Sequence, residues 1–154
     1  FKRSFLCVIL QISLLIGYKN MQLVKTAQID ALFKSAESSS RKRAHLNLHK
    51  TYEDKVQRLY IALICGSYVE PHYHEKPHQW EMFIVKFGLV RVNIHNFEGV
   101  VTNSFLVGDE QDSFTVEFLP GDIHSVECIS EKALLLEIKE GPFVEKHAKV
   151  LLSE

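Results

Sequence analysis

The sequence predicts an all-β domain, either a sandwich or a barrel, with one short helix before it. From about residue 45 onward, apolar side chains recur at every second position along runs such as 59–63, 90–94 and 134–138. A period of two places these side chains on one face of a strand. Turn residues separate the runs: Gly66, Gly88, Gly99, Gly108 and Pro120-Gly121. Many short strands joined by tight turns are typical of β-sandwiches and barrels.

One segment before the strands has helical spacing. Thr26 is expected to cap this helix, and three serines at 38–40 end it. The apolar residues that share its spacing are Ile29, Leu32, Phe33 and Ala36. A basic cluster of Arg41, Lys42 and Arg43 follows. Two interpretations of this cluster stay open: a solvated helix exit, or a clamp for the phosphate or carboxylate of a substrate.

The length of 154 residues is that of one domain with a real core, and no repeat or second domain interrupts it. We expect the helix and a basic linker at 21–44, a barrel at 45–143 and a C-terminal tail at 144–154, with residues 1–20 outside the domain. The tail follows a Gly-Pro pair, which stops a strand ladder because proline cannot donate to it. Its pattern fits either a short strand or a helix packed outside the barrel.

Composition excludes some partners and favours a reducing setting. The formal net charge is −1 and 24% of the residues are charged, so nothing electrostatic favours nucleic acid or an acidic membrane surface. The three cysteines, Cys7, Cys65 and Cys128, form no Cys-x-x-Cys pair, so a structural zinc knuckle is not expected. Their odd number and wide spacing favour reduced thiols and a cytoplasmic location.

Residues 1–20 differ from the rest of the chain. A Lys-Arg pair precedes an apolar run at 5–16, the arrangement of a secretory signal or anchor segment, although the run is short for stable membrane insertion. No Ala-x-Ala pattern follows this run. An alternative hypothesis is that the native chain starts at Met21. Codons that specify residues 17–20 can resemble a bacterial ribosome-binding site ahead of a start codon. Residues 1–20 would then be translated upstream sequence.

The stretch 66–88 contains the clearest functional pattern. His72 and His74 stand at i and i+2, so in an extended chain both side chains point to the same face. Glu81 follows on the next run, and a Pro-Gly-Asp turn later delivers His124 at the start of a strand. Three imidazoles and one carboxylate suit a divalent first-row metal. Three or four protein ligands with open positions are typical of a catalytic metal.

These stretches resemble the two motifs of the cupin superfamily, small double-stranded β-helix barrels related to jelly rolls. The resemblance is carried by Gly-x5-His-x-His-x6-Glu-x6-Gly at 66–88 and by Pro-Gly-Asp-x-His at 120–124. The wider context is similar to the WbuC family of cupin-fold metalloproteins in these segments: RAHLNLH at 43–49, VQR at 56–58, GSYVEPHYH at 66–74, WE at 80–81, PGDIHSV at 120–126 and EIKEGPF at 137–143. This likeness covers most of the chain from Met21 to Phe143. It implies a link to bacterial O-antigen (lipopolysaccharide) and other surface-polysaccharide gene clusters, but no particular reaction.

Carried over position by position, the resemblance implies four metal ligands: His72, His74, Glu81 and His124. Six residues separate His74 from Glu81, more than in the general cupin motif, so Glu75 and His78 stay open as substitutes for Glu81. Cys128 stands where an asparagine is often found. If Glu81 faces inward, Phe83 and Val85 do so too, and a metal or an arginine must compensate the buried carboxylate.

Four further residues are candidates around such a metal. His78 and His49 are the expected proton carriers, and the alternative for His78 is a position in a solvated loop. Asn47 and His49 belong to a strand that could fold over the mouth of the barrel and touch a substrate, or could only support a sheet edge. Arg58 could bind an anionic substrate, or face outward.

The leading functional hypothesis is a metal-dependent cupin that acts on a small polar substrate, a sugar or sugar nucleotide. Isomerisation, epimerisation and oxygen-dependent chemistry all fit, and Fe, Mn, Zn and Ni are all open as the one divalent ion. Two alternatives are a non-enzymatic metabolite-binding cupin and a metal-free sugar-nucleotide isomerase with a histidine base. We expect a homodimer, because small barrels commonly cover exposed edges by pairing.

Overall fold

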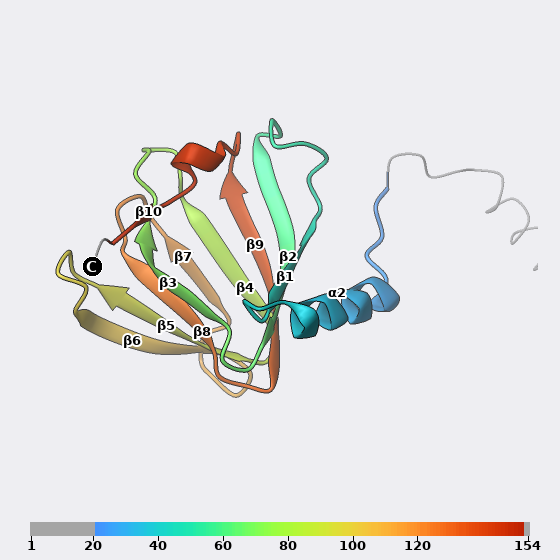
Figure 1. Ribbon diagram of the computed structural model, residues 1–154. Helices are drawn as coiled ribbons and strands as arrows, with labels where there is room; N and C mark the ends of the chain where they lie inside the picture. The colour runs from blue at the N-terminus through green and yellow to red at the C-terminus, as the bar shows by residue number, and fades with distance from the viewer. Residues whose placement is uncertain (1–20, 153–154) are drawn as a thin grey trace, which may run out of the picture.

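The computed structural model describes residues 21–152, which form two β-sheets packed face to face with one helix outside them (Figure 1). One sheet has the strand order β1-β2-β9-β4-β7 and the other has the order β10-β3-β8-β5-β6. Every ladder within these sheets is antiparallel. The all-β class and the N-terminal helix that the sequence predicts are confirmed.

Consecutive strands repeatedly cross between the two sheets. The first sheet holds β1 (Arg43–Asn47), β2 (Val56–Ile64), β4 (Glu81–Phe87), β7 (Thr115–Phe118) and β9 (Lys132–Glu140). The second sheet holds β3 (Tyr68–Tyr73), β5 (Leu89–His95), β6 (Val101–Gly108), β8 (His124–Cys128) and β10 (Val150–Leu151). Because β2, β4 and β7 are each followed by a strand of the other sheet, segments distant in sequence face one another across the sandwich.

The main core lies between the sheets and follows the period-two pattern of the sequence. Leu63 on β2, Val92 on β5 and Phe118 on β7 are at most 2% exposed and belong to this core. Burying each such side chain stabilises the fold by about 1.5–3 kcal/mol. The inward set of β4 is Glu81, Phe83 and Val85, as the alternation predicts, and the only polar member lies at the end of the strand.

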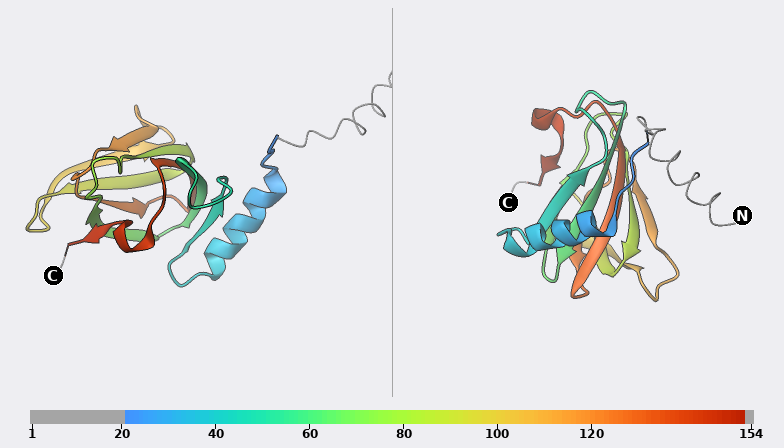
Figure 2. Two further views of the ribbon diagram at one scale, coloured as in Figure 1. Left: turned by 90° about the horizontal axis from the view of Figure 1, so that it is seen from above. Right: turned by 90° about the vertical axis from the view of Figure 1, so that its right-hand side faces the viewer.

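Helix α2 (Thr26–Ser38) covers the outer face of the first sheet (Figure 2). Its buried residues Leu32, Phe33 and Ala36 pack against Ala62 of β2 and Leu134 of β9. These two strands are therefore apolar on both faces along part of their length. A single period-two pattern could not show which face is the interior of the sandwich.

The predicted helix cap is wrong by one residue. Lys25, in extended conformation, precedes the helix, and Thr26 is its first helical residue. The side-chain oxygen of Gln28 accepts a hydrogen bond from the backbone N–H of Lys25 at 3.0 Å. That bond satisfies a donor at the helix start, so no threonine hydroxyl is needed there.

Several element boundaries differ from those expected. Strand β1 begins at Arg43, inside the segment assigned to the linker. The tail contains both alternatives that its pattern allowed, a 3-10 helix η1 (Glu145–His147) and the short strand β10. Strand β10 pairs with β3, so the tail joins the second sheet.

Residues 1–20 lie outside the described residues, so both hypotheses for them stay predictions. Within 21–152, no helix combines the length and the apolar character that a bilayer crossing requires. Of the cysteines in this range, Cys65 is exposed and Cys128 is buried, and the two are not bonded to each other.

Gly88 joins β4 to β5 in a turn that only glycine fits. Its φ is 81°, and an added Cβ would collide with the carbonyl of Lys132 and with Ala133. We expect Gly88→Ala to lower the free energy of unfolding by about 2–4 kcal/mol, the sum of a left-handed backbone and a steric clash. Gly99→Ala is the matched control, because its φ is 78° and nothing lies within 4 Å of an added Cβ. Equal losses in urea unfolding of the two variants would contradict the role assigned to the clash.

Candidate metal centre

Four polar side chains gather at one end of the sandwich: His72, His74, Glu81 and His124. His72 lies on β3 and pairs in register with His124, the first residue of β8. Glu81 begins β4 in the opposite sheet, and His74 follows the end of β3. Their nearest ligand atoms all lie within 4.8 Å of one another. Each of the four residues is at most 6% exposed, so this polar cluster is removed from bulk water.

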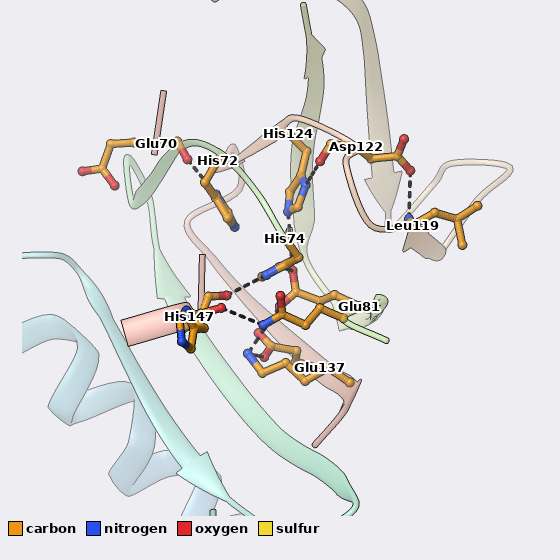
Figure 3. Close-up of polar contacts among 12 residues, drawn as sticks. Glu70, His72, His74, Glu81, Leu119, Asp122, His124, Glu137 and His147 are labelled. Carbon is orange, nitrogen blue, oxygen red and sulfur yellow. Dashed lines mark hydrogen bonds and ion pairs between the residues drawn. The ribbon is translucent and has the colours of Figure 1, made fainter. Parts of the chain in front are cut away.

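The orientation of all three imidazoles is set by backbone carbonyls (Figure 3). The Nδ1 atoms of His72, His74 and His124 lie 2.8 Å from Glu70 O, 2.7 Å from Ala148 O and 3.0 Å from Asp122 O, respectively. A carbonyl only accepts, so each Nδ1 carries the proton and donates. The Nε2 atoms are thereby left for the centre of the cluster, as in metal-binding histidines whose other nitrogen is held by a hydrogen bond.

Glu81 faces the same centre. Its Oε2 lies 3.3 Å from Nε2 of His74 and 3.4 Å from Nε2 of His124. A ring stack holds His124 in place, with the Phe118 ring 3.7 Å away and tilted by 5°. Among the described residues, His124 Nε2 has no hydrogen-bond partner. A buried lone pair without a partner is costly, and a cation at this point would satisfy it.

The charges of the cluster shift its pKa values in different directions. Burial raises the pKa of Glu81, but the imidazoles of His124 and His74 beside it and the charge of Lys139 hold that pKa well below its ordinary value. Burial, with the neighbouring His124, lowers the pKa of His72 to about 4. Burial also lowers the pKa of His74, but the hydrogen bond and charge of Glu81 outweigh it and raise the pKa above 6.5. The cluster therefore holds one ionised carboxylate and a neutral His72 at neutral pH.

A second carboxylate, Glu137, borders the cluster. Lys139 Nζ lies 3.5 Å from Glu81 Oε1 and 2.5 Å from Glu137 Oε1, so one ammonium serves both acids. Burial and the charge of Glu81 raise the pKa of Glu137 to about 7. Neither Glu137 nor Lys139 is among the site residues expected from the sequence. The pattern that indicates them is their spacing, since they follow Leu135 at every second position and Leu135 points into the core.

A cavity of 410 Å³ opens over the cluster. His72, His74 and Glu81 line it, together with Glu137 and Lys139. Other lining residues come from the segment around β1 and from the tail: Arg41, Arg43, His45, Glu145, Ala148 and Lys149. This volume is in the range of small-molecule binding pockets, so the cluster lies at the wall of a cavity that a ligand can enter.

The C-terminal tail, drawn in red at the top of Figure 1, completes this cavity. The carbonyl of Ala148 accepts the bond from His74, and Gln79 Nε2 donates to the carbonyl of His147 at 2.7 Å. The tail was expected as a short strand or helix packed outside the barrel, and its sequence pattern indicated no site residue. No local signal could have found Ala148, because it contributes a backbone atom.

The structure does not bring the other candidate residues to the cluster. His78 is exposed in the loop before β4 and Asn47 is exposed on β1, and neither lines the cavity. His49 is buried away from it, where its Nδ1 lies 3.1 Å from the backbone N of Arg58. His49 and Arg58 line a different surface pocket. Their proposed roles in proton transfer and substrate binding gain no support from these positions.

The alternatives to Glu81 as the carboxylate ligand are also not supported. The side chain of Glu75 is 61% exposed and pairs with Lys76 at 3.4 Å. Neither Glu75 nor His78 belongs to the cluster. Three Nε2 atoms and one carboxylate oxygen, buried and already oriented, fit a single divalent first-row metal ion. The same donors do not choose among Fe, Mn, Zn and Ni.

Comparison with solved structures shows the cupin fold. A cupin superfamily protein from Desulfitobacterium hafniense is similar with a TM-score of 0.50 and 12% identity, over 64% of this chain and 76% of that one. Oxalate oxidase in complex with glycolate gives a TM-score of 0.54 and 16% identity, over 74% of this chain and 57% of that one. CapF with an inhibitor gives a TM-score of 0.61 and 15% identity, over 75% of this chain and 33% of that one.

At such identities these likenesses establish the fold alone. No curated protein matches the chain. A family model described as "Domain of unknown function (DUF6016)" matches residues 24–107, and the finer WbuC assignment stays a prediction. Because that match covers more than half of the 154 residues, the chain is a cupin-fold protein that belongs to the DUF6016 family.

Proposed function

We propose that this protein is a metal-dependent cupin that acts on a small polar molecule, a sugar or sugar nucleotide. The observation that carries the proposal is the convergence of three oriented Nε2 atoms and Glu81 at the wall of a cavity. His72, His74, Glu81 and His124 would hold one divalent ion. When bound, such an ion polarises a substrate oxygen placed in its open positions.

The residues around the cavity support proton transfer by Glu137 and not by His78 or His49, the candidates from the sequence. Glu137 lines the cavity beside Glu81, and its pKa of about 7 lets it hold or release a proton near neutral pH. Lys139 offsets the repulsion between the two carboxylates and orients Glu137 through its 2.5 Å contact. Isomerisation and epimerisation, which move a proton, fit this arrangement, and oxygen-dependent chemistry stays open.

The biological setting rests on the sequence resemblance. Similarity to the WbuC family supports a role in the synthesis of O-antigen or other surface polysaccharides, and the cysteine pattern supports a cytoplasmic location. A homodimer is supported by β6, an edge strand that leaves Val101, Phe105 and Leu106 at least 41% exposed. For the metal itself, Mn is a reasonable first choice, since the structurally similar oxalate decarboxylase of Bacillus subtilis has Mn(II) centres.

The first test is the metal content of the full chain and of three variants. We expect about one equivalent per chain in the wild type, and loss in His74→Ala and Glu81→Gln, because a four-ligand site loses most of its affinity with any one donor. Glu75→Gln is the matched control and should retain the metal, since that carboxylate is exposed and outside the cluster. Loss in Glu75→Gln with retention in Glu81→Gln would overturn the ligand assignment. Absence of metal after reconstitution would favour the metal-free isomerase or the binding module.

The second prediction concerns pH. A metal ion must displace the proton on His74 Nε2, and the pKa of His74 is raised above 6.5. The apparent metal affinity should therefore fall as pH falls through that pKa, by about tenfold per pH unit for one competing proton. His72 should not add a second proton near neutral pH, because its pKa is about 4. Chelator competition across this pH range, with proton release counted by calorimetry in two buffers, checks the prediction; a flat profile would contradict it.

The third prediction concerns the tail. Removal of residues 145–154 takes away the carbonyl of Ala148 that orients His74. Loss of an outer partner of a metal ligand typically weakens metal binding by about 10–100-fold, and we expect a loss in that range. Gln79→Ala removes only the hydrogen bond from Gln79 to the carbonyl of His147, and it should weaken metal binding less. Circular dichroism verifies that both variants fold, and unchanged affinity in the truncated protein would refute the role of the tail.

A further inference from the structure

Three cationic side chains gather at the cavity over the cluster: Arg41, Arg43 and Lys149. Arg41 precedes β1, Arg43 begins β1, and Lys149 lies in the tail immediately before β10. Two segments that are far apart in the sequence thus supply positive charge to the same cavity. Lys42, between the two arginines, does not line the cavity and instead donates to the carbonyl of Cys65 at 3.2 Å.

These three cations form no ion pair with any of the described residues. Within residues 21–152, no carboxylate oxygen lies within the ion-pair distance of 4.0 Å from Arg41, Arg43 or Lys149. Burial lowers the pKa of Arg43, and the neighbouring charge of Arg41 lowers it further, against the charge of Glu70. Burial likewise lowers the pKa of Lys149, and Arg43 and Arg41 both add to this, against Glu70 and Glu81. The cations therefore repel one another, and an anion among them would relieve that repulsion.

The backbone that carries these side chains is fixed. Arg43 Nη1 donates to the carbonyl of Tyr68 at 2.7 Å, which leaves its other guanidinium donors available. The carbonyl of Arg41 accepts a 3.2 Å bond from Ser67, a residue only 2% exposed. Lys149 directly follows Ala148, which is bonded to His74. The cationic group is thus anchored to the same framework as the four-residue cluster.

The remaining charges of the cavity do not neutralise this group. Lys139 is occupied by Glu81 and Glu137, and a divalent ion at the cluster would add further positive charge. Glu145 is the other carboxylate that lines the cavity. With the metal bound, the cavity has a net positive charge, which attracts an anionic ligand.

We propose that the cavity binds a small molecule that carries a phosphate or carboxylate group, held by Arg41, Arg43 and Lys149, with an oxygen of the same molecule toward the four-residue cluster. This inference rests on the proposed function and narrows its substrate class to anions. Arginine pairs well with both groups because its planar donors match their oxygens. The volume of 410 Å³ suits a molecule of monosaccharide-phosphate size or somewhat larger.

The test is a binding titration with three probes: glucose 1-phosphate, glucuronate and glucose. We expect the metal-loaded protein to bind at least one of the two anions more tightly than neutral glucose. In the double variant Arg41→Gln/Lys149→Gln, the affinity for that anion should fall by about tenfold or more, the usual loss for removed charge-assisted hydrogen bonds. The comparison of glucose 1-phosphate with glucuronate tells which anionic group the cavity accepts.

The matched control is the double variant Lys42→Gln/Lys146→Gln. It removes the same charge at neighbouring positions that do not line the cavity, so anion affinity should stay within about twofold at constant ionic strength. An equal loss in both double variants would show that only net charge matters and would overturn the inference. Absence of binding by both anions, or binding of glucose as tight as theirs, would also overturn it.

The same titrations on metal-free protein separate this inference from the proposed function. If the protein takes up no metal but the Arg41→Gln/Lys149→Gln variant alone loses anion binding, the anion site stands and the metal-dependent function fails. If the metal is bound at one equivalent and the variant binds anions like the wild type, the metal site stands and the anion site fails.

Discussion

A buried carboxylate is the constraint on which the site depends. Glu81 is 3% exposed, and a charge in that position must be balanced by its neighbours. His74, His124 and Lys139 all lie within 3.5 Å of its oxygens. Lys139 is shared with Glu137, so one ammonium faces two acids. Two buried carboxylates that share one ammonium leave room for a further cation. The Nε2 atom of His124, which has no hydrogen-bond partner among the described residues, marks where that cation would bind.

Local geometry explains why the four-residue cluster was predictable from the sequence. The carbonyls of Glu70 and Asp122 that orient His72 and His124 each lie two residues before the histidine. For His72 and His124, each motif residue and its supporting carbonyl are therefore close neighbours in the sequence. The alternation on β4 likewise turns Glu81 inward with the apolar residues of that strand, whereas the loop before it is solvated.

The parts that were not predicted depend on contacts between distant segments. On β9, Leu134 packs under α2 while Leu135 packs in the main core, so both faces of the strand carry apolar residues. The sequence pattern therefore could not show that Glu137 faces inward. Asn47 was expected near the mouth of the barrel, but only earlier residues of its strand reach the cavity. The alternation of residues predicts which face of the sheet a side chain lies on. Whether that side chain lies near the cavity depends instead on how the strand is aligned with its neighbours, which the alternation does not show.

The bond between His74 and Ala148 has a consequence for when a metal could enter the site. These residues are 74 positions apart, so the histidine is synthesised well before the carbonyl that orients it. His72, His74 and Glu81 can meet on the nascent chain only without His124 and without the tail. The complete donor set, with His74 oriented, exists only after residue 148 has been synthesised, so a metal that uses all four side chains would be selected after that point.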